Sequence, residues 1–247
     1  MTQHKGKIAF QRDAQHGEIY MWEIPKEGLS YVVTLDPATD ASQTVGADPD
    51  RHSLKVWRKA YRDTAHDVWR PRKLVARLKP PFYGEGDEVA GHAVRLSKFY
   101  GNAIFCQETN CGMDIHRRVR EAGVPCYKGR PISHRTGKIV EQWGFRLKDE
   151  QVRNAIIEAL AACVRDGALD IPCIHTIREY KSFVRTKSGR AEAAGGAHDD
   201  DVLCDAMAFE VDASATMYRE QRAEHVDPPD RKGPGGWRSV NQAKRGW

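Results

Sequence analysis

No stretch of this sequence is apolar for long enough to cross a lipid bilayer. The longest apolar runs, such as YVVTL and AIIEALAACV, are far shorter than the roughly 20 residues that a spanning helix needs. The N-terminal segment MTQHKGKIAF contains no apolar signal core, which argues against export. We therefore expect no membrane association and a cytoplasmic location.

Cysteine has no metal-binding pattern here. The six cysteines show no CxxC spacing and lie mostly inside apolar runs, as buried free thiols do. A structural zinc site or a disulfide framework is therefore not expected, and a reducing compartment is the natural setting.

The sequence also lacks internal repeats, coiled-coil heptads and a nucleotide-binding GxxxxGKS/T loop. The segment YGEGDEVAGH contains glycines but not the lysine that such a loop uses to bind phosphate. We therefore expect no ATP-driven activity from this polypeptide.

The composition fits one large globular domain. The 247 residues are 40% hydrophobic and 30% charged, and the net charge of +5 permits nucleic-acid binding without requiring it. Residues 222–247 are rich in proline, glycine and charge and have no core pattern. We expect a single domain over residues 1–221, followed by a flexible C-terminal tail over 222–247.

Apolar patterning predicts strands first, and then helices that alternate with strands. Strands are expected over 30–38, 53–60, 68–81 and 102–110, with an edge arm over 18–25. Helices are expected over 86–101, 112–123 and 148–167, the last opened by acids and closed by glycine. A short strand is expected after 123, and a strand running into a short helix over 173–184. This order predicts an α/β fold with a mixed sheet.

Three acids occupy positions at which α/β proteins place ligands. Asp36 ends the first buried strand, Glu108 ends another, and Asp200 lies in the first turn of a late helix, in GGAHDDDVLCDAMAFE. The carboxyl ends of buried strands are where such sheets bind ligands. Two simpler interpretations stay open, because Asp36 precedes a proline turn and Glu108 would also suit a loop.

The run of Asp199, Asp200 and Asp201 has two explanations. A helix N-cap needs only one aspartate, stabilised by roughly 0.3–1 kcal/mol, so capping leaves two unexplained. Carboxylates from separate segments repel unless a cation neutralises them, and oxygen ligands favour Mg²⁺ or Mn²⁺ over zinc. Successive helical residues point about 100° apart, so we expect Asp200 to face the sheet with Cys204 and Asp201 to turn toward solvent.

Four segments resemble, in order, the nuclease domain of bacteriophage large terminases. YVVTLDPATD resembles the first motif, a hydrophobic strand followed by Asp-Pro-Ala. AIFCQETNCGMDIHRRVREAG resembles the second, in which a glutamate after a strand precedes Asn-x-Gly and a helix. WGFRLKDEQVRNAIIEAL matches the stretch before the third motif, and FVRTKSGRAEAAGGAHDDDVLCDAMAFE resembles the third. The resemblance covers roughly residues 15–215.

This resemblance implies a ribonuclease-H-like fold, with a mixed five-stranded sheet flanked by helices. It also implies metal-dependent endonucleolytic cleavage of concatemeric viral DNA during genome packaging. By motif, the catalytic residues are Asp36, Glu108 and Asp200, and His198 would orient water or the scissile phosphate. The ligands of two Mg²⁺ or Mn²⁺ ions would be Asp36, Glu108, Asp199 and Asp200, and which of the two adjacent aspartates binds directly stays open.

Basic clusters supply candidates for binding double-stranded DNA. A glycine-containing basic loop over residues 128–138 is favoured, because a loop can close over a duplex. Each cluster taken alone is also compatible with an ordinary solvated face. The expected DNA-binding residues are Lys128, Arg130, Arg135, Lys138, Arg72 and Lys73.

A full-length large terminase carries an ATPase domain, whose phosphate-binding loop this sequence lacks. The resemblance therefore implies either an excised domain or a separately encoded nuclease that meets its ATPase motor in trans. Small terminase and portal protein are the other implied partners. Two alternatives remain: another ribonuclease-H-like nuclease, such as a junction resolvase or an RNA–DNA hybrid nuclease, and a non-catalytic module that binds DNA or the portal.

Overall fold

The computed structural model describes residues 10, 12–13, 16–38, 51–129, 141–186, 189–195 and 197–211. Its main feature is a six-stranded mixed sheet in the order β1-β6-β3-β2-β7, with β10 paired to β6. The strands are β1 (Ile19–Met21), β2 (Tyr31–Asp36), β3 (Ser53–Arg58), β6 (Arg72–Leu78), β7 (Ile104–Gln107) and β10 (Leu169–Asp170). β2 and β3 are buried over their whole length, so both faces of the sheet are covered.

The register of β2 fixes which residues meet at one edge of the sheet. β2 runs antiparallel to β3, with Asp36 opposite Ser53, and parallel to β7, with Leu35 opposite Gln107. The chain between β2 and β7 passes through β3, β6 and α1 (Gly86–Phe99), which supplies the long connection that a parallel pair requires. The carboxyl ends of β2 and β7 therefore lie side by side.

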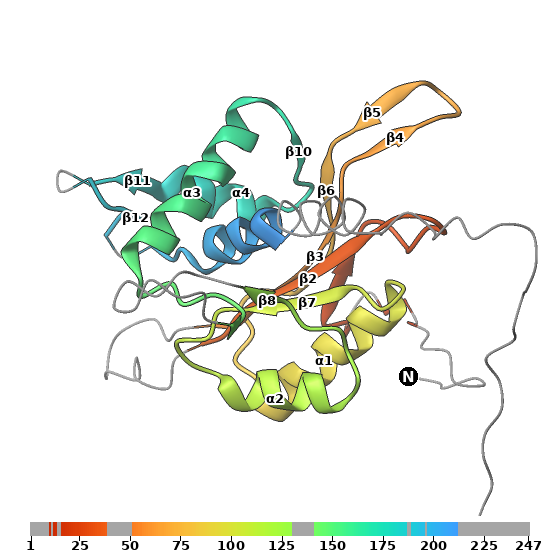
Figure 1. Cartoon of the computed structure of the whole chain (residues 1–247), viewed down its shortest axis with the longest axis horizontal. Helices are drawn as coiled ribbons and strands as arrows, with labels where there is room; N and C mark the ends of the chain where they lie inside the picture. The colour runs from red at the N-terminus through yellow and green to blue at the C-terminus, as the bar shows by residue number, and fades with distance from the viewer. Residues whose placement is uncertain are drawn as a thin grey trace, which may run out of the picture.

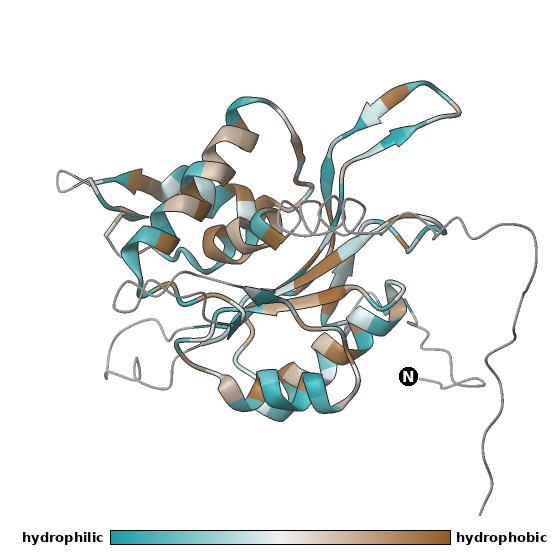
Figure 2. Ribbon diagram, in the orientation of Figure 1, coloured by the Kyte–Doolittle hydropathy of each residue, from teal (hydrophilic) through white to brown (hydrophobic). Residues whose placement is uncertain are grey.

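Helices cover the two faces of the sheet (Figure 1). α1 and α2 (Met113–Glu121) lie on one face, and α3 (Glu150–Arg165), α4 (Ile174–Ser182) and a helix over residues 200–211 lie on the other. A hydrophobic core lies on each face of the sheet, and alternate residues of β2 point into one core or the other. Val33 and Leu35 pack with α1, and Val32 packs on the face that also contains Phe209. Hydrophobic residues are prominent in the central strands (Figure 2).

Three strand pairs form small sheets separate from the main sheet. β4 (Tyr61–Asp63) pairs with β5 (Val68–Arg70), and this hairpin projects from the body of the molecule in Figure 1. β8 (Lys128–Gly129) pairs with β9 (Gln142–Trp143), and β11 (Phe183–Arg185) pairs with β12 (Ala191–Ala193). The second hairpin therefore flanks the basic loop, and the third immediately precedes the aspartate run.

Most elements expected from the sequence are confirmed. The helices over 86–101, 112–123 and 148–167 are α1, α2 and α3, and the Asp149 carboxylate caps α3 by accepting the N–H groups of Gln151 and Val152. The 18–25 arm is β1 at the sheet edge. The six cysteines are free thiols, and none of the described helices combines the length and apolarity of a membrane span.

Three expectations about elements need correction. The sheet has a sixth strand, β10, which the sequence did not indicate. The segment 68–81 is not one strand but two, because β5 belongs to the projecting hairpin and β6 to the sheet. The segment 173–184 forms a helix followed by a strand, the reverse of the expected order. The expected tail over 222–247 lies outside the described residues.

Candidate metal centre at the ends of two parallel strands

Asp36 and Glu108 lie on neighbouring strand ends. Asp36 is the last residue of β2, and Glu108 follows β7 directly and donates its backbone N–H to the carbonyl of Leu35 at 3.0 Å. Each of the two acids is only 8% exposed. The parallel register of β2 and β7, continued by one residue, places Asp36 and Glu108 opposite one another on the same face of the sheet.

The helix over 200–211 covers that same face. Thr34 lies two residues before Asp36, and the Cys204 Sγ contacts its Oγ1 at 3.2 Å. Asp200 precedes Cys204 by one helical turn, about 6 Å along the axis, and Asp36 lies about 7 Å beyond Thr34 along β2. The helix runs from the Ser53 end of β3 toward Trp57, which contacts Phe209. The first turn of the helix, which contains Asp200, is therefore directed toward the strand ends that carry Asp36 and Glu108.

The side chains of His198 and Asp200 lie close together at the start of this helix. The His198 Nδ1 lies 3.5 Å from the Asp200 Oδ2, and the side chains are 18% and 15% exposed. Asp199 is held differently, because the buried Arg153 donates to its Oδ2 at 2.8 Å. Arg153 also donates to the carbonyl of Ala191 in β12. The two adjacent aspartates thus have different partners and face different surroundings.

Asp201 does not face solvent, contrary to the expectation from the sequence. Its side chain is buried, and its pKa is held well below the usual range because the charges of Lys55 and Arg77 outweigh the effect of burial. Arg77 on β6 is 2% exposed and pairs with Asp201 inside the protein. The helix is turned so that Asp201, and not only Asp200, points away from solvent.

The turn after β7 holds Glu108 in place. Asn110 donates to the Glu108 Oε1, and the Cys111 thiol lies 3.7 Å from its Oε2. Gln107 donates its side-chain amide to the carbonyl of Gly112 at 2.6 Å. Gly112 opens α2 with a positive φ of 61° and packs against Pro37, the residue after Asp36. The ETNCG sequence therefore ties the two strand ends together.

The donor set of these acids suits a hard divalent cation. Asp36, Glu108 and Asp200 offer only carboxylate oxygens, which Mg²⁺ and Mn²⁺ prefer. In the described part of the chain their oxygens do not all lie within 4.8 Å of one another, since the one such group is elsewhere. By the chemistry of their donor atoms, these residues therefore fit a divalent-ion site.

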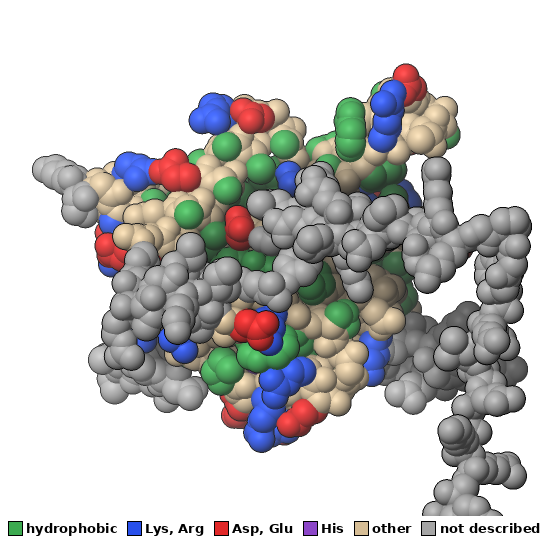
Figure 3. All heavy atoms as spheres, in the orientation of Figure 1, with side chains coloured by type: hydrophobic (Ala, Val, Ile, Leu, Met, Phe, Trp, Pro, Cys, Tyr) green, Lys and Arg blue, Asp and Glu red, His purple; other side chains and the backbone are tan. Residues whose placement is uncertain are grey.

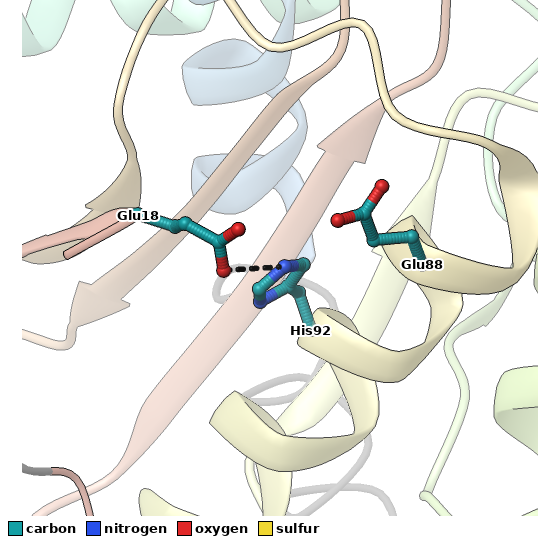
Figure 4. Close-up of side chains that lie close together, drawn as sticks. All are labelled: Glu18, Glu88 and His92. Atoms are coloured by element: carbon teal, nitrogen blue, oxygen red, sulfur yellow. Dashed lines mark ion pairs between the residues drawn. The ribbon is translucent and has the colours of Figure 1, made fainter. Parts of the chain in front are cut away.

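That other group, Glu18, Glu88 and His92, lies beside β1 and α1 (Figure 4). Arg95 donates to the His92 Nδ1 at 2.9 Å, so the neutral ring carries its proton on Nε2, which faces the Glu18 carboxylate at 3.4 Å. Burial, together with the charge of Arg95, lowers the His92 pKa to about 4. Both ring nitrogens are thus engaged within the protein, and neither offers a lone pair to an ion.

The expected DNA-binding residues that the structure describes lie in two separate places. Lys128 and Arg120 lie over the Trp143 ring, at 5.0 and 5.3 Å from its centroid, and basic side chains gather over α2 in Figure 3. Arg72 and Lys73 lie at the opposite end of β6 from Arg77, where Lys73 pairs with Asp170. Three of the expected DNA-binding residues lie outside the described residues: Arg130, Arg135 and Lys138.

The fold defined by this sheet and its helices is ribonuclease-H-like. Solved structures of phage large terminase nucleases share it, and they cover most of this chain. The nuclease from thermophilic phage G20c aligns with a TM-score of 0.57 at 19% identity, over 83% of this chain and 92% of the other. The nuclease domain from Thermus phage P74-26 aligns with a TM-score of 0.53 at 19% identity, over 79% and 86%.

The G20c nuclease has also been solved with bound magnesium and with bound cobalt, and these structures align with TM-scores of 0.55 and 0.56. No protein-family model matches this chain, and no curated protein sequence matches it at a significant level. The likeness is therefore one of fold, at an identity of 19–20%.

Proposed function

We propose that this chain is a metal-dependent endonuclease that cleaves double-stranded DNA, and specifically concatemeric viral DNA during genome packaging. The observation that supports this most is the convergence of Asp36, Glu108 and the Asp200 helix turn on one sheet edge. The same fold is found in phage terminase nucleases that bind divalent ions. Together they favour phosphodiester hydrolysis over a purely structural role.

In this proposal Asp36, Glu108 and Asp200 would together hold two divalent ions, with Asp36 as the central ligand. Bound Mg²⁺ or Mn²⁺ would generate the attacking hydroxide and stabilise the leaving 3′ oxygen. His198, paired with Asp200, orients water or the scissile phosphate. Asp199 is the weaker candidate for direct ligation because Arg153 already binds its carboxylate.

The proposed DNA path follows Lys128 and the adjoining loop, with Arg130, Arg135 and Lys138 as further contacts. Lys128 and Arg120 gather around Trp143 near α2, which is on the β7 side of the sheet. The path omits Arg72 and Lys73, because they lie at the end of β6 far from Asp36. A basic surface of this kind binds phosphates without reading sequence.

The proposed setting is the cytoplasm of an infected cell, where the chain acts beside an ATPase motor, either as the nuclease part of a longer chain or with the motor supplied in trans. Small terminase and portal protein are the further partners in this proposal. Residues 222–247 have no core pattern, so we propose that they serve docking rather than cleavage. A chain ended at Glu224 should then still cut DNA.

Plasmid cleavage tests the proposal. Supercoiled plasmid is incubated with the protein in Mn²⁺, in Mg²⁺ or in EDTA, and nicked and linear products are measured. Cutting should require an ion and should vanish in Asp36→Asn, while Asp166→Asn, on an exposed surface at the end of α3, should cut normally. A folded wild type that never cuts would favour the non-catalytic alternative. Preferential cutting of four-way junctions or RNA–DNA hybrids would move the protein to another ribonuclease-H-like class.

A further inference from the structure

Beneath the helix over 200–211 lies a buried polar network that the proposed chemistry does not use. The Asp201 Oδ1 accepts from the Ser53 hydroxyl at 2.8 Å and pairs with the Lys55 ammonium at 3.4 Å. Its Oδ2 accepts from Arg77 and, at 2.8 Å, from Thr176. Each oxygen of Asp201 therefore has two partners, and these partners come from β3, β6 and α4.

Asp205, one turn further along, repeats the arrangement. Its two oxygens accept from Lys55 at 2.9 Å each, and also from the Trp57 ring nitrogen at 2.8 Å and the Tyr180 hydroxyl at 3.1 Å. Asp201 and Asp205 are four residues apart and so point the same way. Because Asp200 points about 100° from Asp201, the network fixes the direction in which Asp200 projects.

Glu179 on α4 secures the first turn of the same helix. Its Oε2 accepts the backbone N–H of Asp201 at 2.8 Å, one of the donors that have no partner inside a helix. Thr176, one turn earlier on α4, binds the Asp201 side chain. α4 therefore holds both the backbone and the side chain of the residue that follows Asp200.

We propose that Glu179 is a positioning residue for the cleavage proposed above, on which this inference rests. By accepting the Asp201 N–H from outside the helix, it fixes the first turn and so directs Asp200 toward Asp36 and Glu108. Glu179 itself touches no reacting atom. Glu179 supplies a hydrogen-bond acceptor at a fixed position, and the side-chain amide oxygen of a glutamine would supply the same acceptor.

Burial, and then the charge of Asp201, raises the pKa of Glu179 to about 7. A neutral carboxamide is therefore a close substitute for this side chain near neutral pH. The decisive variants are Glu179→Ala, which removes the acceptor, and Glu179→Gln, which keeps it. The matched control is Glu158→Ala, which removes an exposed carboxylate on α3.

Three measurements are made on the full chain. Amide hydrogen exchange follows residues 200–204 without any ion, and plasmid cleavage with Mn²⁺ gives kcat, with DNA affinity measured separately in Ca²⁺. Glu179→Ala should speed exchange in this first turn and lower kcat by roughly 10- to 100-fold, as expected for a small displacement of a reacting group. DNA affinity should be unchanged, and Glu179→Gln should restore both exchange and kcat.

Several results would overturn the inference. Unchanged exchange and kcat in Glu179→Ala would show that the first turn does not depend on this acceptor. Failure of Glu179→Gln to restore kcat would show that the charge matters, and not the hydrogen bond. A wild type that exchanges as expected but never cuts would remove the proposed function, while the exchange data would still decide whether Glu179 fixes the helix start.

Discussion

Lys55 donates to both carboxylate oxygens of Asp205, at 2.9 Å each, and neither side chain has any exposed surface. Burial lowers the pKa of Lys55, but the charges of Asp201 and Asp205 outweigh it and raise that pKa above its ordinary value. The lysine is therefore charged near neutral pH. This pair joins the centre of β3 to the helix over 200–211.

Breaking this pair from one side should destabilise the fold strongly. Lys55→Met leaves Asp205 buried without its cation, and Asp205→Leu leaves Lys55 without one acid, so each should cost about 3–5 kcal/mol in unfolding free energy. The double variant should cost clearly less than the sum. Urea denaturation measures all three. Additive losses would mean that the two side chains do not interact, and removal of the exposed Arg62–Asp67 pair, a control, should change little.

Replacing the three consecutive aspartates singly by asparagine should give three different outcomes. Asp200→Asn should abolish cutting with an unchanged melting temperature, because Asp200 lies at the proposed centre. Asp199→Asn should impair cutting, since Arg153 then loses its anion. Asp201→Asn should lower the unfolding free energy by about 3 kcal/mol, because Lys55 and Arg77 lose a buried charge. Plasmid cleavage and thermal melting of each variant separate these results. Equal cleavage activity and equal melting temperatures in all three variants would mean that the three aspartates serve only to cap the helix.

Acid should destabilise the protein through His92. Its folded pKa is about 4 and its ordinary value is 6.5, so the unfolded chain binds more protons between these values. Stability should therefore fall as the pH is lowered from about 6.5 to 4, and His92→Gln should remove this part of the decline. Urea denaturation at several pH values gives the comparison. If the stability of the wild type and of His92→Gln fell equally with decreasing pH, the prediction would be wrong. His66→Gln, on the exposed β4–β5 hairpin, is the control.

A methyl group at position 144 should disturb the strand end that carries Glu108. Gly144 has a φ of +58°, and a Cβ there would overlap the carbonyl oxygen of Gln107. Gly144→Ala should therefore cost more stability than Gly123→Ala, where φ is also positive but nothing lies within 4 Å. Comparing the melting temperatures of the two variants separates the cost of the steric overlap from the cost of the positive φ, which both variants share. Equal shifts would show that the local backbone moves aside freely.

The strand ends were predictable because they depend on local pattern. YVVTLDP joins a β-branched apolar run to an acid and a proline, so the end of β2 at Asp36 follows from the sequence. The convergence of Asp36 and Glu108 then needs only a parallel pairing of two buried strands. Their role in metal binding remains a prediction.

The burial of Asp201 was not predictable from the helix alone. Asp201 and Asp205 share one face, and two acids on one face are typical of a solvated side. Both acids are buried because they pair with Lys55, which lies in the middle of β3 between Leu54 and Val56. The sequence alone does not indicate which acids pair with this lysine. A lysine inside an otherwise apolar strand was the available signal. The helix–strand order over 173–184 was missed because β-branched residues such as Ile174 disfavour a helix only weakly, and the segment is helical despite them.

Because the helix over 200–211 brings Asp200 to acids set far earlier in the chain, assembly of the site is a late event in synthesis. A nascent chain can pair β2 with β3 and β7 while the helix is still inside the ribosome, but Lys55 and Arg77 then lack their anions. The docking of one helix thus supplies both the missing counter-charges and the third acid. A partly made chain therefore has neither a completed core nor all three acids of the candidate metal centre.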